Sequence, residues 1–198
     1  EVAAVAAGQS HSLALLVSGR VVAWGANHVG QARVPAGLSN AVAIAAGGDH
    51  SMALTAEGQV FVWGDNEYGQ TRLPAGLSNI VAIAAGGTDC LALRADGGLV
   101  AWGKYRRYTG VSWNFDTVAV PVPARLTGVT AIAAGKTHGL AIDASERVVA
   151  WGWGFDGGWD WPAVFPADVT GVIAVSAGGP DRGLALTHDG RVVGQRRE

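Results

Sequence analysis

Histidine recurs at one position of a repeated segment, and three histidines spaced in this way could bind a metal ion or polarise a small ligand. His11, His50 and His138 each follow an Ala-Gly pair after a short polar loop. Imidazole is a common ligand of zinc and of other transition metals. Here, however, the repeat itself sets the spacing, so the spacing does not argue for coordination. We therefore interpret these histidines as structural groups that hydrogen-bond the loop backbone through both ring nitrogens, and we predict no metal and no cofactor.

The same position varies in the other two repeats, which makes acidic residues nearby better candidates for ligand contact. Asp89 replaces histidine in the third repeat, and the fifth repeat has Asp181 and Arg182 with one extra residue. Asp49 precedes His50 in the second repeat. With His50 and His138, these residues form a secondary set of candidates for one face of the molecule.

Two segments depart from an otherwise regular repeat and concentrate aromatic and arginine side chains. They read KYRRYTGVSWNFD from Lys104 and WGFDGGWDWPAVF from Trp153. Aromatic residues and arginine dominate binding hot spots, and stiff rings lose little entropy on contact. We predict a partner-binding site made of Tyr105, Arg106, Arg107, Tyr108, Trp113, Phe115, Trp153, Phe155, Trp159, Asp160 and Trp161. The alternative is that these segments fold back and bury their own rings, because large exposed apolar patches are uncommon on monomers.

Other chemistries have weaker support in the sequence. No GxSxG, Walker or HExxH motif occurs, so the chain is not predicted to be an enzyme. A carbohydrate-binding, lectin-like module is one alternative, because exposed Trp153, Trp159 and Trp161 could stack on sugar rings while Asp160 binds hydroxyls. A small enzyme with a His and Asp site is the other alternative.

The elements that must position these residues come from a fivefold internal repeat. It reads AAGQSHSLAL from Ala6, AAGGDHSMAL from Ala45, AAGGTDCLAL from Ala84, AAGKTHGLAI from Ala133 and SAGGPDRGLAL from Ser176. A Trp-Gly pair follows in the first four units, with tryptophans 39, 39 and 49 residues apart. A period near 40 with glycine-rich turns is typical of a propeller blade of about four strands. We predict one all-β domain, a β-propeller of five short blades over 1–40, 41–79, 80–128, 129–171 and 172–198, with the last blade incomplete.

Each unit predicts a series of strands around a central hub. The alanine-rich strand should be innermost, because only small side chains fit where blades converge. The second and third strands should meet at two-residue turns such as Ser18-Gly19, Glu57-Gly58, Asp96-Gly97 and Asp189-Gly190. Ser145-Glu146 stands there in unit four and predicts a different turn, and a weak fourth strand is expected near 71–73. The repeated tryptophans Trp24, Trp63, Trp102 and Trp151 are interpreted as packing residues between diverging blades.

The segments AGQSHSLAL with WGANHVGQ, and AGGDHSMAL with WGDNEYGQ, resemble the regulator of chromosome condensation repeat. The resemblance covers all five units and weakens after the second. The short period and the linkers QARVPAGLSN and QTRLPAGLSN are most similar to compact bacterial members, among them β-lactamase-inhibiting propellers of streptomycetes. That resemblance implies a secreted binder that presses one face onto an enzyme. A repeat of this kind indicates a fold more firmly than it indicates a partner.

Strand order predicts which loops share a face. If strands alternate up and down, the loops after Ala-Gly and after Trp-Gly lie on one face, and the Asp-Gly turns and Pro-Ala-Gly linkers lie on the other. The first face carries the irregular segments, and Asn27 and Asn66 are expected to form turns there. This face is therefore the predicted binding face.

Composition limits the kinds of partner and the covalent cross-links that the chain can have. The net charge is −2, which provides no drive toward nucleic acid, and no apolar stretch is long enough for a membrane span. Cys90 is the single cysteine, so no internal disulfide can form.

The last unit bears on whether the ring closes. In unit five Gln195 stands where tryptophan is expected. We expect the five units to close a ring; the alternatives are part of a larger propeller, or a homo-oligomer in which a second copy covers the open last blade.

Overall fold

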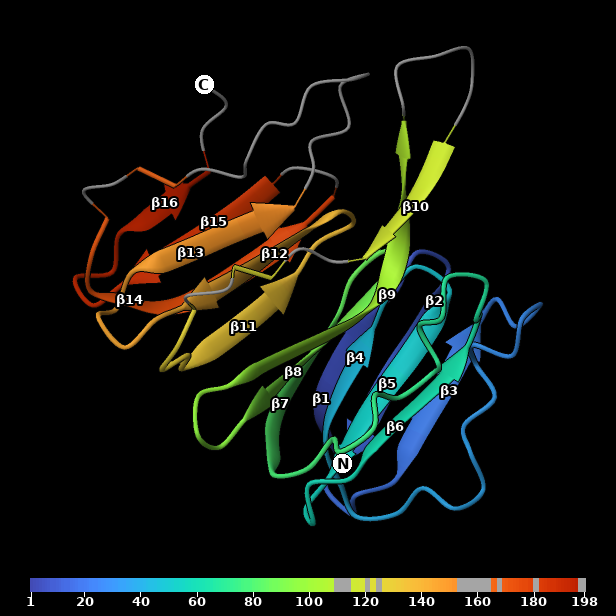
Figure 1. Cartoon of the computed structure of the whole chain (residues 1–198). Helices are drawn as coiled ribbons and strands as arrows, with labels where there is room; N and C mark the ends of the chain where they lie inside the picture. Colours follow the sequence, from blue (N-terminus) through green and yellow to red (C-terminus); the bar gives the residue numbers. More distant parts are fainter. Residues whose placement is uncertain are drawn as a thin grey trace.

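The chain folds into five small antiparallel sheets, which follow one another in sequence as the blades of a propeller (Figure 1). The computed structural model describes residues 1–108, 115–119, 122–123, 126–152, 165–166, 169–179 and 182–195, with the backbone alone for 105–108 and 115–119. The predicted all-β five-bladed propeller is confirmed. The described part of the chain contains no helix that could reach across a lipid bilayer.

Three strands make up the common blade, in sequence order from the hub outward. The blades consist of β1 (Val2–Ala7), β2 (His11–Leu16) and β3 (Val21–Gly25); β4 (Ala41–Ala46), β5 (His50–Thr55) and β6 (Val60–Gly64); β7 (Ile80–Ala85), β8 (Asp89–Arg94) and β9 (Leu99–Tyr108) with β10 (Phe115–Ala119); β11 (Ala131–Ala134), β12 (His138–Ile142) and β13 (Val148–Gly152); and β14 (Val172–Gly178), β15 (Arg182–Thr187) and β16 (Val192–Gly194).

The fourth strand predicted near 71–73 does not form, because this segment is a turn and an extended linker. A fourth strand occurs in blade 3, where β10 pairs with β9. Blade 5 has the shortest third strand, since β16 has three residues whereas the third strands of the other blades have at least five.

The turns between second and third strands show how local sequence fixes the blade. Gly19, Gly58, Gly97 and Gly190 have φ of 76° to 82°, a backbone conformation that favours glycine. The expectation of a different turn in blade 4 is wrong. Glu146 adopts φ 57°, and its N–H bonds to the Asp143 carbonyl just as Gly19 N–H bonds to Leu16. The flanking strands therefore impose the same turn on a side chain that is poorly suited to it.

The core consists of four junctions between consecutive blades. In the first junction Leu13 and Leu15 of blade 1 pack against Ala53 and Trp63 of blade 2. The other three clusters repeat this arrangement along the chain. The alanine-rich first strands lie at the hub, as predicted, since Ala7, Ala46, Ala85, Ala134 and Ala177 line one central cavity.

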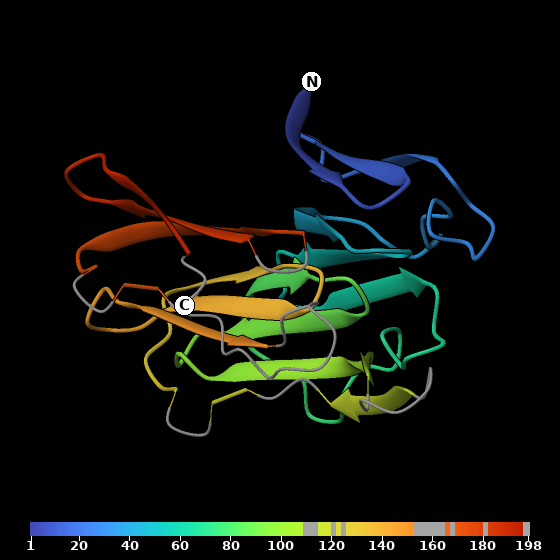
Figure 2. The same cartoon turned by 90° about the horizontal axis from the view of Figure 1, so that it is seen from above.

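The expected closure of the ring is not found. The first strands pack in succession, β1 on β4, β4 on β7, β7 on β11 and β11 on β14, but β14 and β1 form no equivalent contact. Figure 2 shows the first and last blades as the free ends of this succession. The physical reason lies in the curvature: each junction fixes the angle between two blades, and four such angles leave the ends apart. The five blades form an open arc.

Candidate functional site

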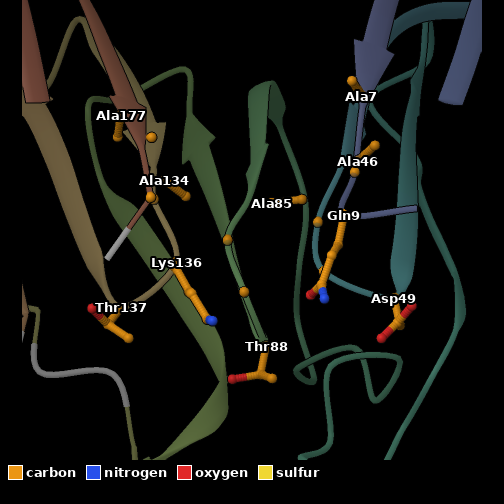
Figure 3. Close-up of a pocket in the computed structure, with 18 of the residues that line it drawn as sticks. Ala7, Gln9, Ala46, Asp49, Ala85, Thr88, Ala134, Lys136, Thr137 and Ala177 are labelled. Atoms are coloured by element: carbon orange, nitrogen blue, oxygen red, sulfur yellow. The ribbon is translucent and has the colours of Figure 1, made fainter. Parts of the chain in front are cut away.

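A cavity of about 550 Å³ opens at the hub, and all five blades contribute to it. Its wall consists of the ends of the first strands and the loops that follow them (Figure 3). Asp65 and Tyr68, which follow the second Trp-Gly pair, also line it. The loops after Ala-Gly and after Trp-Gly therefore share one face, which we call the mouth face.

Backbone hydrogen bonds join the two sets of loops directly. Ala26 N–H donates to Ser10 O at 2.8 Å in blade 1, and Asp65 N–H donates to Asp49 O at 2.9 Å in blade 2. These bonds explain why the predicted pairing of loops on one face holds: the third strand ends beside the start of the second strand in the antiparallel sheet.

Glycine at the mouth permits close approach between blades. A Cβ on Gly8 would overlap the Gly47 carbonyl of the next blade and the ring of His11. Gln9 N–H instead donates across the junction to Gly47 O at 3.2 Å. The same relation recurs at the next three junctions, so backbone hydrogen bonds join consecutive blades around the rim of the cavity.

The Trp-Gly loops of blades 1 and 2 are fixed by their own amide side chains. Asn27 Oδ1 accepts the Ala32 N–H at 3.1 Å, and Asn66 Oδ1 accepts the Thr71 N–H at 3.2 Å. The prediction that both asparagines form turns is confirmed. Gln31, which is fully buried, donates its amide to Asp49 Oδ1 at 3.0 Å and so ties this loop to blade 2.

The cavity itself presents both charges and several neutral polar groups. Asp49 and Lys136 come from different blades and are drawn with Gln9 and Thr88 around the opening in Figure 3. Asp49 also lies 3.9 Å from His28 Nε2, at an exposed site where such a pair contributes little. A polar opening of mixed charge is suited to hydrogen-bonding a polypeptide and has no bias toward a polyanion.

The repeated histidines do not face the cavity as a cluster. His11 Nε2 donates to Ser51 Oγ of the next blade at 2.9 Å, because the single hydroxyl proton of Ser51 goes to Gln31 O at 2.8 Å. His50 Nε2 lies 3.2 Å from Cys90 Sγ in the second junction. The structural interpretation holds, but the partners differ from those predicted: they are side chains of the next blade, and Nδ1 of both His11 and His50 has no hydrogen-bond partner among the described residues.

Burial decides the protonation of these groups. It lowers the pKa of His50 to about 4, with a smaller contribution from nearby His11, so the ring is neutral at physiological pH. Burial also lowers the pKa of His11. No three His, Cys, Asp or Glu side chains within the described ranges lie close enough together to hold a metal ion.

Asp89 takes the place of histidine in blade 3 and is buried in the same way. Burial raises its pKa to about 7, although backbone N–H groups of Asp89 and Thr88 oppose this shift. Burial, together with the Asp89 charge, also raises the pKa of the Cys90 thiol. The thiol is therefore inert and the carboxyl is a packing group, so neither has access to a ligand.

The residues of the secondary candidate set lie at different places in the structure. Asp49 lines the cavity, whereas His50, Asp89 and His138 are buried in junctions. Arg182 is exposed at the start of β15, and Asp181 lies outside the described residues. Sequence reasoning missed Gln9, Thr88, Lys136 and Thr137, which line the opening. The signal was present, because these are the loop positions directly after Ala-Gly where polar residues interrupt a glycine pattern.

The main candidate segment of blade 3 forms a two-stranded ribbon that extends beyond the mouth face (Figure 1). In blades 1, 2 and 4 the third strand ends at the glycine of Trp-Gly, whereas β9 continues from Gly103 to Tyr108 and pairs with β10 from Ala119 back to Phe115. The extra length is about 16 Å. Thr88 Oγ1 donates to Lys104 O at 2.5 Å and so ties the base of the ribbon to the rim.

The ribbon accounts for five of the predicted binding positions by backbone. Tyr105, Arg106, Arg107 and Tyr108 lie on β9, and Phe115 begins β10. The remaining positions lie outside the described residues: Trp113, Trp153, Phe155, Trp159, Asp160 and Trp161. Whether these rings are presented or folded back stays a prediction.

Repeated three-stranded blades around a glycine-lined hub define a propeller-type repeat protein. The family model of the regulator of chromosome condensation (RCC1) repeat matches residues 2–31, 41–70 and 129–157, within blades 1, 2 and 4. Three of the five blades therefore match the RCC1 repeat, and the fold of the chain is a propeller. Comparison with curated protein sequences finds no match.

Solved structures are similar over nearly the whole chain. Human WBSCR16 superposes on 98% of this chain and 61% of its own, with 24% identity and a TM-score of 0.74. Prp20p from Saccharomyces cerevisiae covers 98% of this chain and 57% of its own, with 23% identity and a TM-score of 0.71. The ectodomain of the Physcomitrella patens receptor kinase CR4 covers 98% and 49%, with 22% identity and a TM-score of 0.69. This chain spans about three-fifths or less of these relatives.

Proposed function

We propose that this propeller is a non-catalytic binding module that recognises a protein partner through its mouth face. The observation that carries the proposal is the blade 3 ribbon. It interrupts a regular repeat, stands on the rim of the hub cavity, and has two tyrosines and two arginines on its first strand. A two-stranded ribbon beside a polar opening offers a projecting element and a recess to the same partner.

Structural relatives are consistent with this proposal. Prp20p was studied for its binding to Gsp1p and histones, and yeast RCC1 has been crystallised with Kap60 bound. These partners belong to those proteins. For this chain we propose the coarser property, a protein-binding face, and add that an enzyme partner would be inhibited if the ribbon entered its active-site cleft.

The competing functions have less physical basis. A His and Asp catalytic site at the mouth would need accessible groups, yet His50, Asp89 and His138 are each at most 3% exposed. The tryptophans on which a lectin-like site would depend lie outside the described residues. A glycan array with a clear hit that survives Arg107→Ala would favour the lectin alternative.

The test is capture of partners from the native host with four forms of the chain. We expect Arg107→Ala and Trp159→Ala each to abolish capture of a protein that the unmodified chain retains, without lowering the melting temperature. Arg20→Ala is the matched control, because Arg20 is exposed at the turn before β3, on the opposite face. If both site variants unfold the chain, or if both retain the partner, Arg107 and Trp159 are structural residues and the proposal is wrong.

A further inference from the structure

The third strand of blade 3 continues past its inner neighbour and leaves one edge unpaired at the rim of the hub. The sheet runs β10, β9, β8, β7 with β7 at the hub, so β8 lies on the hub side of β9. Pairing of β8 with β9 ends at Asp89 opposite Gly103, whereas β9 continues to Tyr108. Among the strands that the structure describes, none pairs with this side of β9 beyond Gly103. We call the hub-side edge of residues 104–108 the ribbon edge.

The direction of the backbone groups shows what the ribbon edge offers. In an antiparallel sheet the N–H and C=O of one residue point to the same side, and successive residues alternate sides. The carbonyl of Lys104 accepts the Thr88 hydroxyl at 2.5 Å, so Lys104 faces the hub side. The residue after Trp-Gly in blade 2 donates its N–H in the same direction, at 2.9 Å. Arg106 and Tyr108 therefore each turn one N–H and one C=O toward the ribbon edge.

The intervening residues hold the ribbon together. Tyr105 and Arg107 lie opposite Val118 and Asp116, and their backbone groups point toward β10. The ribbon is thus a complete ladder on its outer side and an open row of donors and acceptors on its hub side. An open row of this kind is a template for a further strand.

Charge distinguishes the possible occupants of the ribbon edge. Lys104 and Arg106 share one face of β9, because alternate positions of a strand share a face. Neutral residues, Ala119 and Thr117, lie opposite them in β10. An acidic residue opposite Arg106 on an added strand would also be diagonal to Lys104, and opposite charges at such positions stabilise a strand pair. A second copy of the same edge would instead bring cations against cations, which is unfavourable.

We propose that the ribbon edge binds an extended segment of the partner protein as an added β-strand, with an acidic residue opposite Arg106. The inference rests on the proposed function, because it assigns a mode of recognition to the same ribbon. Main-chain hydrogen bonds to Arg106 and Tyr108 position the added strand, and the charges of Arg106 and Lys104 select its sequence. Since β8 ends directly below, the lower end of the added strand reaches Thr88 at the mouth of the cavity.

A short synthetic strand tests the proposal without knowledge of the partner. The probe is the peptide Val-Glu-Val-Glu-Val, blocked at both ends, which reads the same in both directions. Its titration is followed through the backbone amide resonances of the chain. We expect the amides of Arg106 and Tyr108 to shift most, because their N–H groups face the added strand. The neutral peptide Val-Gln-Val-Gln-Val should bind about two- to fivefold more weakly, which is the scale of an exposed ion pair.

Methylation of the peptide nitrogens separates backbone pairing from charge. N-methylation at both Glu residues removes the two N–H groups that face the ribbon edge, and should weaken binding by about tenfold or more. N-methylation at the central Val is the matched control, because that nitrogen points away from the edge, and it should leave the affinity nearly unchanged. Equal effects of the two modifications would overturn the proposal, and so would absence of binding of the unmodified peptide at millimolar concentration.

Two variants of the chain make the same separation on the other side of the pair. Proline is tolerated in an edge strand where its nitrogen faces outward, so Arg106→Pro should keep the melting temperature but weaken peptide binding by about tenfold or more. Arg106→Gln keeps the N–H and should lose only the charge contribution, about two- to fivefold. Equal affinities of the two variants would contradict strand addition. Concentration-dependent shifts of the Arg106 amide without peptide would mean that a second copy occupies the edge, and would also overturn the proposal.

Failure of this proposal is distinguishable from failure of the proposed function. Peptide binding without capture of any host protein would refute the proposed function and leave the strand-binding edge in place. Capture that depends on Arg107 and Trp159, together with no peptide binding, would refute strand addition alone.

Discussion

At the scale of single residues, Asp89 shows how one substitution in a repeat changes the chemistry of a buried position. Histidine at this position is kept neutral by burial, and burial acts on aspartate in the opposite direction, raising its pKa to about 7. The folded chain therefore holds a proton on Asp89 that the unfolded chain releases near pH 4. The stability associated with the neutral carboxyl is complete below pH 4 and is lost as the pH rises to about 7.

Asp89→Asn should remove this loss. We expect the variant to match the original chain at pH 4 and to be more stable at pH 8, by on the order of a few kcal/mol. Thermal melts across this range measure the difference. Glu67→Gln is the control, because Glu67 is exposed and should leave the pH profile unchanged. An Asp89→Asn profile parallel to that of the original chain would show that the carboxyl is ionised and paired in the folded state.

Glu146 makes a second prediction at the residue scale. It adopts the left-handed backbone that glycine provides in the other four blades. Glu146→Gly should therefore stabilise the chain by about 0.5–1 kcal/mol, a rise of a few degrees in melting temperature. Ser145→Gly, next to it, should give no gain, since Ser145 does not have positive φ. Equal effects of the two substitutions would contradict the role assigned to the turn.

At the scale of elements, the sequence predicted those features of the blade that depend on local pattern. The inner alanine strand, the glycine turns and the shared mouth face all follow from local pattern and alternating strand direction. The fourth strand did not form: residues 71–73 are a turn and an extended linker, and the outer edge of β6 stays unpaired among the described residues. The ribbon was seen only as an irregular loop, since pairing of 104–108 with 115–119 depends on register, which composition does not reveal.

The junctions make a prediction at this same scale. Trp63→Ala should cost about 3–5 kcal/mol, because it empties a packed junction and leaves Gln31 O without its donor. Trp24→Ala is the matched control at the equivalent position of blade 1. Its ring is half exposed, so the cost should be about 1 kcal/mol or less. Equal losses in urea unfolding would mean that blade 1 is covered in solution.

At the scale of the whole molecule, the number of blades was predictable and the shape of the assembly was not. Five aligned units indicate five blades, but ring closure depends on the angle that each junction sets. That angle comes from packing such as Leu13 against Trp63, and no periodicity encodes it. The candidate binding site was likewise predictable only in part. The irregular segment of blade 3 was found from sequence, whereas the mouth cavity is formed by all five blades together and is visible only in the structure.

The open arc is the central claim, and distances between spin labels at matched turn positions test it most directly. Glu57→Cys with Asp96→Cys spans adjacent blades, and Ser18→Cys with Asp189→Cys spans blades 1 and 5 at the equivalent exposed positions. Buried Cys90, whose thiol pKa is raised, should stay unlabelled in both. We predict a clearly longer distance for the 18/189 pair than for the 57/96 pair. Equal distances would mean a closed five-bladed ring and would contradict the account.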